Sequence, residues 1–255
     1  MKHISSRDNP LYKQFVRSIS GKRGARTVLE GIHLCQEWLL HRGPPEHALF
    51  DLQRLDRDPQ LVELAGAVPS NRATSCEPVL ARGLSQVQEN QGVYFLVEAP
   101  HDPLPPEIVA TSLWLDRIQD PGNVGTLLRT AAAAGIEQAF LSTGCAGAWT
   151  PKVLRSAQGA HFAMRLYEDV DLASLHAKLR VPLIATALDN ARSVYDTSLP
   201  QQCAWLFGNE GQGVAPILLD LADHRVFIPQ AEGVESLNVA AAAAICLFEH
   251  RRRAL

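Results

Sequence analysis

The stretch from Leu113 to Gly135 constrains the fold of this chain more than any other. A short apolar run from Leu113 to Ile118 is suited to a buried strand. The four turn formers Asp-Pro-Gly-Asn at 120–123 then break this run. The stretch therefore predicts a strand that ends in a tight turn.

A helix is predicted to follow the turn. The apolar residues that come next have the spacing of one helical face: Val124, Leu127, Leu128 and Ala131. Asn123 is placed to cap the start of this helix, and Gly135 to end it. Arg129 is a long cation among Leu, Thr and Ala, and folding does not require it.

A cluster of prolines marks a boundary between two domains. Residues 100–106 contain four prolines, which fix φ and supply no backbone donor. We therefore predict a small α/β domain at 1–99, a proline-rich linker at 100–110 and a larger domain at 111–255. The larger domain alternates helical patterns with strand-like runs at 113–118, 139–142, 181–187, 204–207 and 225–228. This alternation predicts an α/β fold with a parallel sheet and helices on both faces.

Composition limits the classes of protein that the chain can belong to. Its five cysteines are scattered and have no CxxC spacing, which favours a reducing compartment over a disulfide framework or a zinc site. We therefore expect no metal. No apolar run approaches the length of about 20 residues that spans a bilayer, and the start lacks the apolar core of a secretory signal. The prediction is a cytoplasmic protein with no membrane partner.

Three polar loops follow predicted strands of the larger domain. The first contains Asn123, the second is the glycine-rich segment 206–213 with Glu210, and the third spans 228–238 with Ser236 and Asn238. Each loop alone is explained by turns and helix caps. Because ligands of parallel sheets bind beyond the carboxyl ends of the strands, the three together predict an active site.

Common nucleotide-binding and hydrolase motifs are missing. The chain has no G-x-G-x-x-G after a strand, no G-x-x-x-x-G-K-[ST] and no G-x-S-x-G. A nucleotide-dependent oxidoreductase is therefore a weak alternative, and a phosphate-cradling NTPase loop is excluded.

The three motifs DRIQDPGNVGTLLRTAAAAG, LFGNEGQGV and IPQAEGVESLNVAAAAAICLFE, in this order, resemble those of the SpoU family of RNA ribose 2′-O-methyltransferases in the SPOUT superfamily. The segments ISSRDNPLYKQF and VLEGIHLCQEWL resemble, more loosely, the L30e-like substrate-binding domain common in that family. The resemblance implies a carboxyl-terminal domain with a deep trefoil knot, S-adenosylmethionine as cofactor and a homodimer that completes the site.

The resemblance also implies residue roles. The family's active positions fall on Asn123, Arg129, Glu210, Ser236 and Asn238, and its cofactor positions on Ala187, Leu206, Gly208, Ile228 and Leu237. Arg129 corresponds to the residue often assigned as the base. A guanidinium is protonated at essentially all accessible pH, so a bidentate clamp on the phosphate beside the target ribose is an equally good role.

The expected substrate is RNA. The net charge is −3, so any RNA contact must come from a local patch. The basic amino end offers one, through Lys13, Arg17, Lys22 and Arg23, although basic termini are often only solvated. The L30e-like resemblance favours ribosomal RNA over transfer RNA. A tRNA 2′-O-methyltransferase and a non-catalytic RNA-binding protein that retains the fold are the alternatives.

Overall fold

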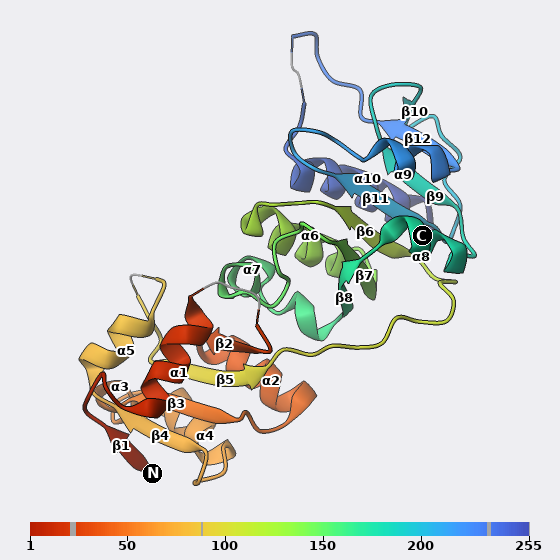
Figure 1. Cartoon of the computed structure of the whole chain (residues 1–255). Helices are drawn as coiled ribbons and strands as arrows, with labels where there is room; N and C mark the ends of the chain where they lie inside the picture. The colour runs from red at the N-terminus through yellow and green to blue at the C-terminus, as the bar shows by residue number, and fades with distance from the viewer. Residues whose placement is uncertain (21–23, 88, 234–235, 255) are drawn as a thin grey trace. The chain divides into compact units, whose positions relative to one another are not determined.

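The computed structural model describes residues 1–20, 24–87, 89–233 and 236–254 (Figure 1). The chain divides into two compact units. The amino-terminal unit consists of Met1–Pro100 and Trp149–Phe162, and the carboxyl-terminal unit of His101–Ala148 and Ala163–Leu255. The division after Pro100 falls where the prolines begin.

The amino-terminal unit is built on a five-stranded mixed sheet in the order β1-β4-β3-β5-β2. Its strands are β1 (Lys2–Ile4), β2 (Arg26–Glu30), β3 (His47–Asp51), β4 (Ala73–Cys76) and β5 (Val93–Glu98). Its helices are α1 (Pro10–Ile19), α2 (Ile32–Arg42), α3 (Leu52–Leu55), α4 (Pro59–Ala67) and α5 (Pro78–Leu84). Asn9 caps α1 by accepting the backbone N–H groups of Leu11 and Tyr12, and Phe15 of this helix is fully buried.

A segment from the second half of the chain completes this unit. It contains α7 (Pro151–Ala157) and the 3₁₀ turn η1 (Ala160–Phe162). The Thr27 hydroxyl of β2 donates to the Trp149 carbonyl at 2.6 Å, and the Trp38 and Trp149 rings meet edge to face at 6.4 Å. This packing was not predicted, because the segment lies far from residues 1–100 in the chain.

The carboxyl-terminal unit contains a seven-stranded sheet in the order β10-β12-β9-β11-β6-β7-β8, in which every pair is parallel. The predicted parallel sheet is confirmed. Its strands are β6 (Ser112–Asp116), β7 (Gln138–Ser142), β8 (Arg165–Val170), β9 (Leu183–Thr186), β10 (Arg192–Ser193), β11 (Ala204–Gly208) and β12 (His224–Phe227). The five predicted strands are present, whereas β8 and β10 were not predicted. Both lie at sheet edges and carry polar residues that interrupt an apolar pattern.

Helices cover both faces of this sheet. They are α6 (Pro121–Ala133), α8 (Leu172–Leu175) with the 3₁₀ turn η2 (His176–Lys178), α9 (Pro216–Leu221) and α10 (Val239–Ala254). On one face, α8 and α9 pack with Trp114, Phe140 and Leu206. Trp205 points to the opposite face, where its Nε1 donates to His250 Nδ1 of α10 at 3.3 Å, and α10 packs against α6.

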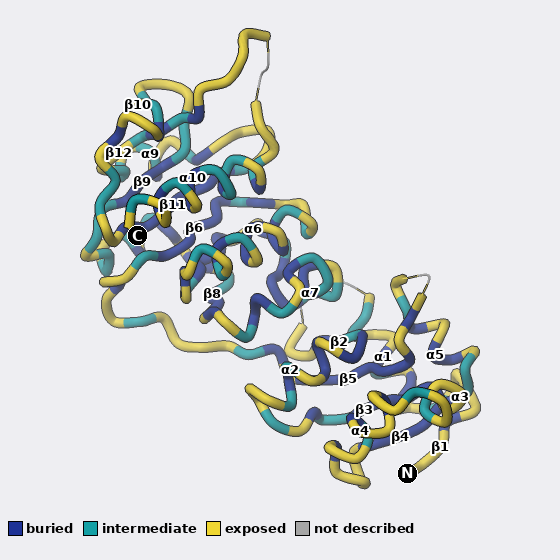
Figure 2. Tube along the Cα trace, turned by 180° about the vertical axis from the view of Figure 1, so that it is seen from behind, coloured by how far each residue is buried: buried dark blue, intermediate teal, exposed yellow. Residues whose placement is uncertain are grey.

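Burial is concentrated in the centre of the sheet (Figure 2). Every residue of β6 and β11 is buried, as expected for strands covered on both faces. The carboxyl ends of these strands are therefore held by a well-packed core. Within the described residues, no helix is long and apolar enough to cross a membrane.

The start of α6 corrects one prediction. Asp120 is the N-cap, because its Oδ1 accepts the Asn123 N–H at 2.8 Å, and Pro121 occupies the first helical position. Asn123 lies inside the first turn, so its side chain is free for other contacts. The predicted helix stop is confirmed, since Gly135 has φ +88° directly after the last turn.

Candidate active site

A cavity of about 710 Å³ lies beyond the carboxyl ends of β9, β11 and β12. Most of its lining comes from four segments, 186–189, 207–214, 226–230 and 236–239. Two of the three predicted loops therefore meet in one cavity. The first loop, at the start of α6, joins them through hydrogen bonds.

The loop after β11 folds tightly over the end of its own strand. A Cβ atom added at Gly208 lies 2.1 Å from the Val214 backbone nitrogen, so only glycine fits there. Gly213 has φ +69°, which also favours glycine. Asn209 Oδ1 closes the turn by accepting the N–H groups of Gly211 and Gln212, both at 3.0 Å. Gly208 is thus required because the backbone of Val214 passes close to it.

A chain of polar side chains connects the three loops. Asn238 Nδ2 donates to Asn123 Oδ1 at 3.0 Å, and Asn123 Nδ2 donates to Glu210 Oε1 at 2.9 Å. The contacts of Asn238 determine which atoms donate in this chain. Its Oδ1 caps α10 by accepting the N–H groups of Ala240 and Ala241, so only its amide nitrogen remains to donate outward.

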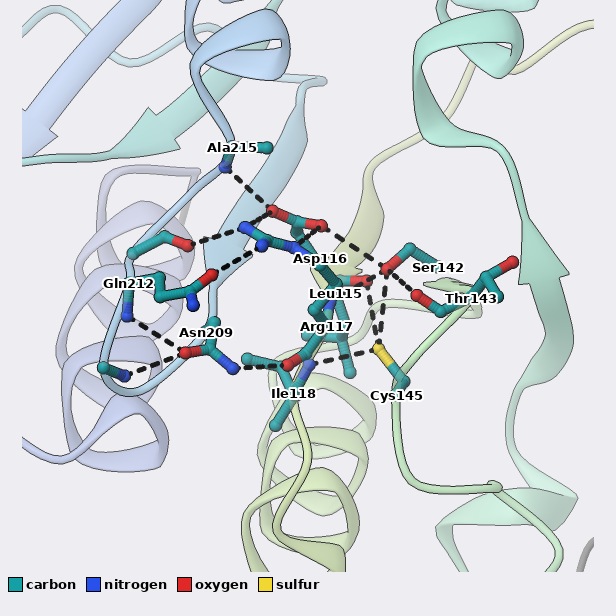
Figure 3. Close-up of polar contacts among 12 residues, drawn as sticks. Leu115, Asp116, Arg117, Ile118, Ser142, Thr143, Cys145, Asn209, Gln212 and Ala215 are labelled. Carbon is teal, nitrogen blue, oxygen red and sulfur yellow. Dashed lines mark hydrogen bonds and ion pairs between the residues drawn. The ribbon is translucent and has the colours of Figure 1, made fainter.

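Asp116 and Arg117 form a second polar cluster at the end of β6 (Figure 3). The buried Asp116 carboxylate accepts Arg117 Nε and a terminal guanidinium nitrogen, both at 3.0 Å, and the Ala215 N–H at 2.8 Å. The hydrogen bond to Asp116 raises the pKa of Arg117. The motif DRIQDPGN contained both residues, but no role was predicted for either. The signal available in the sequence was a charged pair at the end of an apolar strand, since buried charges need partners.

The predicted catalytic residues divide into two groups. Glu210, Ser236 and Asn238 line the cavity, and Asn123 is hydrogen-bonded to two of them. Arg129 is exposed on α6, and its side chain has no hydrogen bond or ion pair among the described residues and does not line the cavity. It lies six residues after Asn123, which at 3.6 residues per turn is a rotation of about 240° around the helix. Arg129 therefore leaves α6 on a different side from Asn123.

Four of the five predicted cofactor residues line the cavity: Ala187, Gly208, Ile228 and Leu237. The fifth, Leu206, does not line the cavity and is fully buried in the core against α8 and α9. Strand alternation turns its side chain into that core, and its carbonyl accepts the Thr186 hydroxyl at 3.3 Å.

The lining matches the chemistry of S-adenosylmethionine. Val226, Ile228 and Leu237 provide apolar surface for an adenine ring, and the turn 208–213 offers backbone donors and acceptors. The carboxylates of Asp189 and Glu210 suit the positive charges of a sulfonium and an amino group. Ligand pockets are typically about 300–1,000 Å³, so the cavity is also large enough. No group of three or more His, Cys, Asp or Glu residues within the described ranges is arranged to hold a metal ion.

The predicted RNA-binding residues lie in the amino-terminal unit. Lys13 Nζ is 2.8 Å from Asp8 Oδ1, and Arg17 on the same helix is exposed and has no ion pair with any described residue. Lys22 and Arg23 lie outside the described residues.

Comparisons with known proteins agree with this site. The sequence profile of the SpoU rRNA Methylase family matches residues 110–248. An uncharacterised tRNA/rRNA methyltransferase of Synechocystis sp. is 35% identical over 98% of this chain and 93% of its own length. The 23S rRNA (guanosine(2553)-2'-O)-methyltransferase RlmP of Bacillus subtilis is 33% identical over 98% of this chain and 100% of its own.

A solved structure extends the likeness to the fold. The AdoMet-bound rRNA methyltransferase of Sinorhizobium meliloti is 26% identical and superimposes with a TM-score of 0.87. The superposition covers 100% of this chain and 98% of that one. Motifs, cavity and fold thus lead to one assignment: the chain belongs to the SpoU rRNA methylase family and is an S-adenosylmethionine-dependent RNA methyltransferase.

Proposed function

We propose that this protein methylates the 2′-hydroxyl of a ribose in ribosomal RNA. The observation that carries the proposal is the hydrogen-bonded chain from Asn238 through Asn123 to Glu210 beside the cavity. It gathers polar groups from three separate loops at one place, as an active site requires. RlmP of Bacillus subtilis, by its name, acts on a guanosine 2′-oxygen of 23S rRNA, which supports the ribosomal substrate.

S-adenosylmethionine supplies an electrophilic methyl group on a sulfonium. The protein has to place the ribose oxygen in line with this methyl and to assist loss of the hydroxyl proton. Asn123 donates a hydrogen bond to Oε1 of Glu210. The other carboxylate oxygen, Oε2, has no hydrogen bond among the described residues. We assign this oxygen to hold a polar hydrogen of the substrate or cofactor, and Ser236 to the same cavity wall.

We propose that Arg129 acts in the site of a second copy of the chain. It does not line the cavity of its own chain, and its guanidinium has no hydrogen bond or ion pair among the described residues. The neighbouring helix α10 exposes apolar surface, with Phe248 45% exposed and Ala241 also exposed. A homodimer that pairs through α6 and α10 buries this surface and delivers Arg129 as a base or a phosphate clamp.

Three further predictions accompany this function. The trefoil knot and the L30e-like, RNA-binding character of residues 1–99 follow from the resemblance to the family. A cytoplasmic location is supported by the five cysteines, which are all buried and form no disulfide with a described residue.

Mapping 2′-O-methylation in cells with and without the gene tests the proposal. One position of ribosomal RNA is expected to lose its methyl group in the deletion strain and to regain it with the wild-type gene. The loss of a transfer RNA methyl group instead would favour the alternative substrate. No change in either RNA, together with S-adenosylmethionine binding by the purified protein, would contradict the proposed reaction.

A further inference from the structure

Arg117 has a backbone conformation that an arginine rarely adopts. Its φ is +54°, in the left-handed region where a Cβ atom is disfavoured and where glycine is the usual residue. Such strain persists only where surrounding contacts hold it in place. The contacts of the Arg117 side chain therefore identify its role.

The pair Asp116–Arg117 holds the loop after β11 on its outer side. One terminal nitrogen of Arg117 donates to Gln212 Oε1 at 2.9 Å and the other to the Gly213 carbonyl at 3.4 Å. The Arg117 carbonyl accepts Asn209 Nδ2 at 2.8 Å. Asp116 adds the Ala215 N–H at 2.8 Å, so two adjacent residues bind the loop 209–215 at both ends and in its middle (Figure 3).

The same loop is limited on its inner side by Gly208. The backbone of Gly213 and Val214 already lies against Gly208, where a Cβ atom would not fit. Residues 209–214 line the cavity, whereas Asp116 and Arg117 do not. The pair can therefore affect the cofactor only through the loop.

We infer that Asp116 and Arg117 are positioning residues that hold the loop 209–215 in the shape that binds S-adenosylmethionine. This inference rests on the proposed function for its cofactor and adds two residues to which no role was assigned. The Asp116 side chain is 5% exposed and orients the guanidinium through two parallel hydrogen bonds. The planar guanidinium of Arg117 joins Asp116 to Gln212 and Gly213. A water molecule in its place could not make the same set of hydrogen bonds.

The test compares Arg117→Gly with Arg117→Lys. The glycine variant removes the guanidinium and also relieves the left-handed strain, so a loss of stability from strain is avoided. The lysine variant keeps the Cβ atom and the charge but cannot bridge three partners in the geometry of a planar fork. Arg180→Ala is the matched control, because Arg180 forms an Arg–carboxylate pair with Glu107 at 3.0 Å in the same unit and does not line the cavity.

Calorimetry without RNA gives the Kd for S-adenosylmethionine, and steady-state assays give kcat and both KM values. In both Arg117 variants the Kd and the KM for the cofactor are expected to rise about tenfold, with kcat at saturating cofactor within about twofold and the KM for RNA unchanged. Arg180→Ala should leave all four values unchanged.

A Kd equal to that of the wild type in Arg117→Lys would overturn the inference. So would a fall in kcat with an unchanged KM for the cofactor. Failure of the proposed function would give a different result, because wild-type protein would then bind the cofactor and methylate no ribosomal RNA. The comparison of Kd values would still decide the role of Arg117.

Discussion

Asn123 Nδ2 donates to Glu210 Oε1 at 2.9 Å and so joins the first turn of α6 to the loop after β11, 87 residues further along the chain. The side-chain oxygen Oδ1 of Asn123 accepts a hydrogen bond from Asn238 Nδ2 at the start of α10. A side-chain amide carries both an acceptor and donors, so Asn123 can accept from one neighbour and donate to the other. Asn123 is thus the central residue of the site.

Asn123→Asp tests this arrangement. The new carboxylate faces Glu210 and repels it, although an acidic residue in the first turn of a helix does not destabilise the helix. We expect kcat/KM to fall at least about 100-fold with little change in thermal stability. Asp120→Ala is the control with the opposite pattern, because it removes the cap of α6 and should cost about 1 kcal/mol of stability without a comparable loss of activity. Equal activity of Asn123→Asp and the wild type would contradict the proposed site.

Arg129→Ala should abolish methyl transfer and preserve cofactor binding, because Arg129 does not line the cavity of its own chain. Loss of one cation that stabilises the transition state lowers kcat/KM by about 10³-fold. The measurement is turnover on a defined RNA, beside the Kd for S-adenosylmethionine. Retained turnover would show that Arg129 is not part of the reaction.

Mixed dimers test whether Arg129 acts across subunits. Arg129→Ala and Asn238→Ala are expected to be inactive alone, whereas dimers with one subunit of each kind contain one complete site if Arg129 serves the other chain. Co-expression of the two variants should then restore activity, and light scattering should report a dimer. Restored activity is impossible if both residues act within the same chain.

Gly208→Ala should weaken cofactor binding and destabilise the fold. Its Cβ atom would lie 2.1 Å from the Val214 nitrogen, so the backbone of the loop must move. Overpacking of this kind typically costs about 1–3 kcal/mol of unfolding free energy. Gly211→Ala is the matched control in the same loop, since the nearest atom to its added Cβ is Asn209 Oδ1 at 3.7 Å. Denaturant unfolding and calorimetry distinguish the two variants, and equal stability would contradict the close approach at Gly208.

The basic amino end should give RNA affinity a steep dependence on salt. Each phosphate contact that is lost lowers the slope of log K against log salt by about 1. Arg17→Ala is expected to lower it more than Lys13→Ala, because Lys13 is paired with Asp8. Arg57→Ala, which removes another exposed cation of the same unit, is the control. An unchanged slope for Arg17→Ala would show that this end is only solvated.

Much of the carboxyl-terminal fold was predictable because its signals are local. Apolar runs gave β6 and β11, and the helix stop at Gly135 required only a residue that tolerates positive φ. The N-cap was misassigned because Asp120 and Asn123 are both good caps, and only the hydrogen bond between them identifies the first. The segment 149–162 was missed because its partners, such as Thr27, are distant in sequence.

The sequence by itself determined five strands of the central sheet, the helix α6, and the three loops from which the site is built. These features depend on apolar spacing and on turn residues within a few positions of one another. Only the tertiary structure decided which polar groups meet. Asn123 and Asn238 are 115 residues apart, and Arg117 reaches Gln212 across 95 residues. Parallel strands place these loops at one edge of the sheet, but the hydrogen bonds among them depend on backbone geometry that residue spacing does not encode.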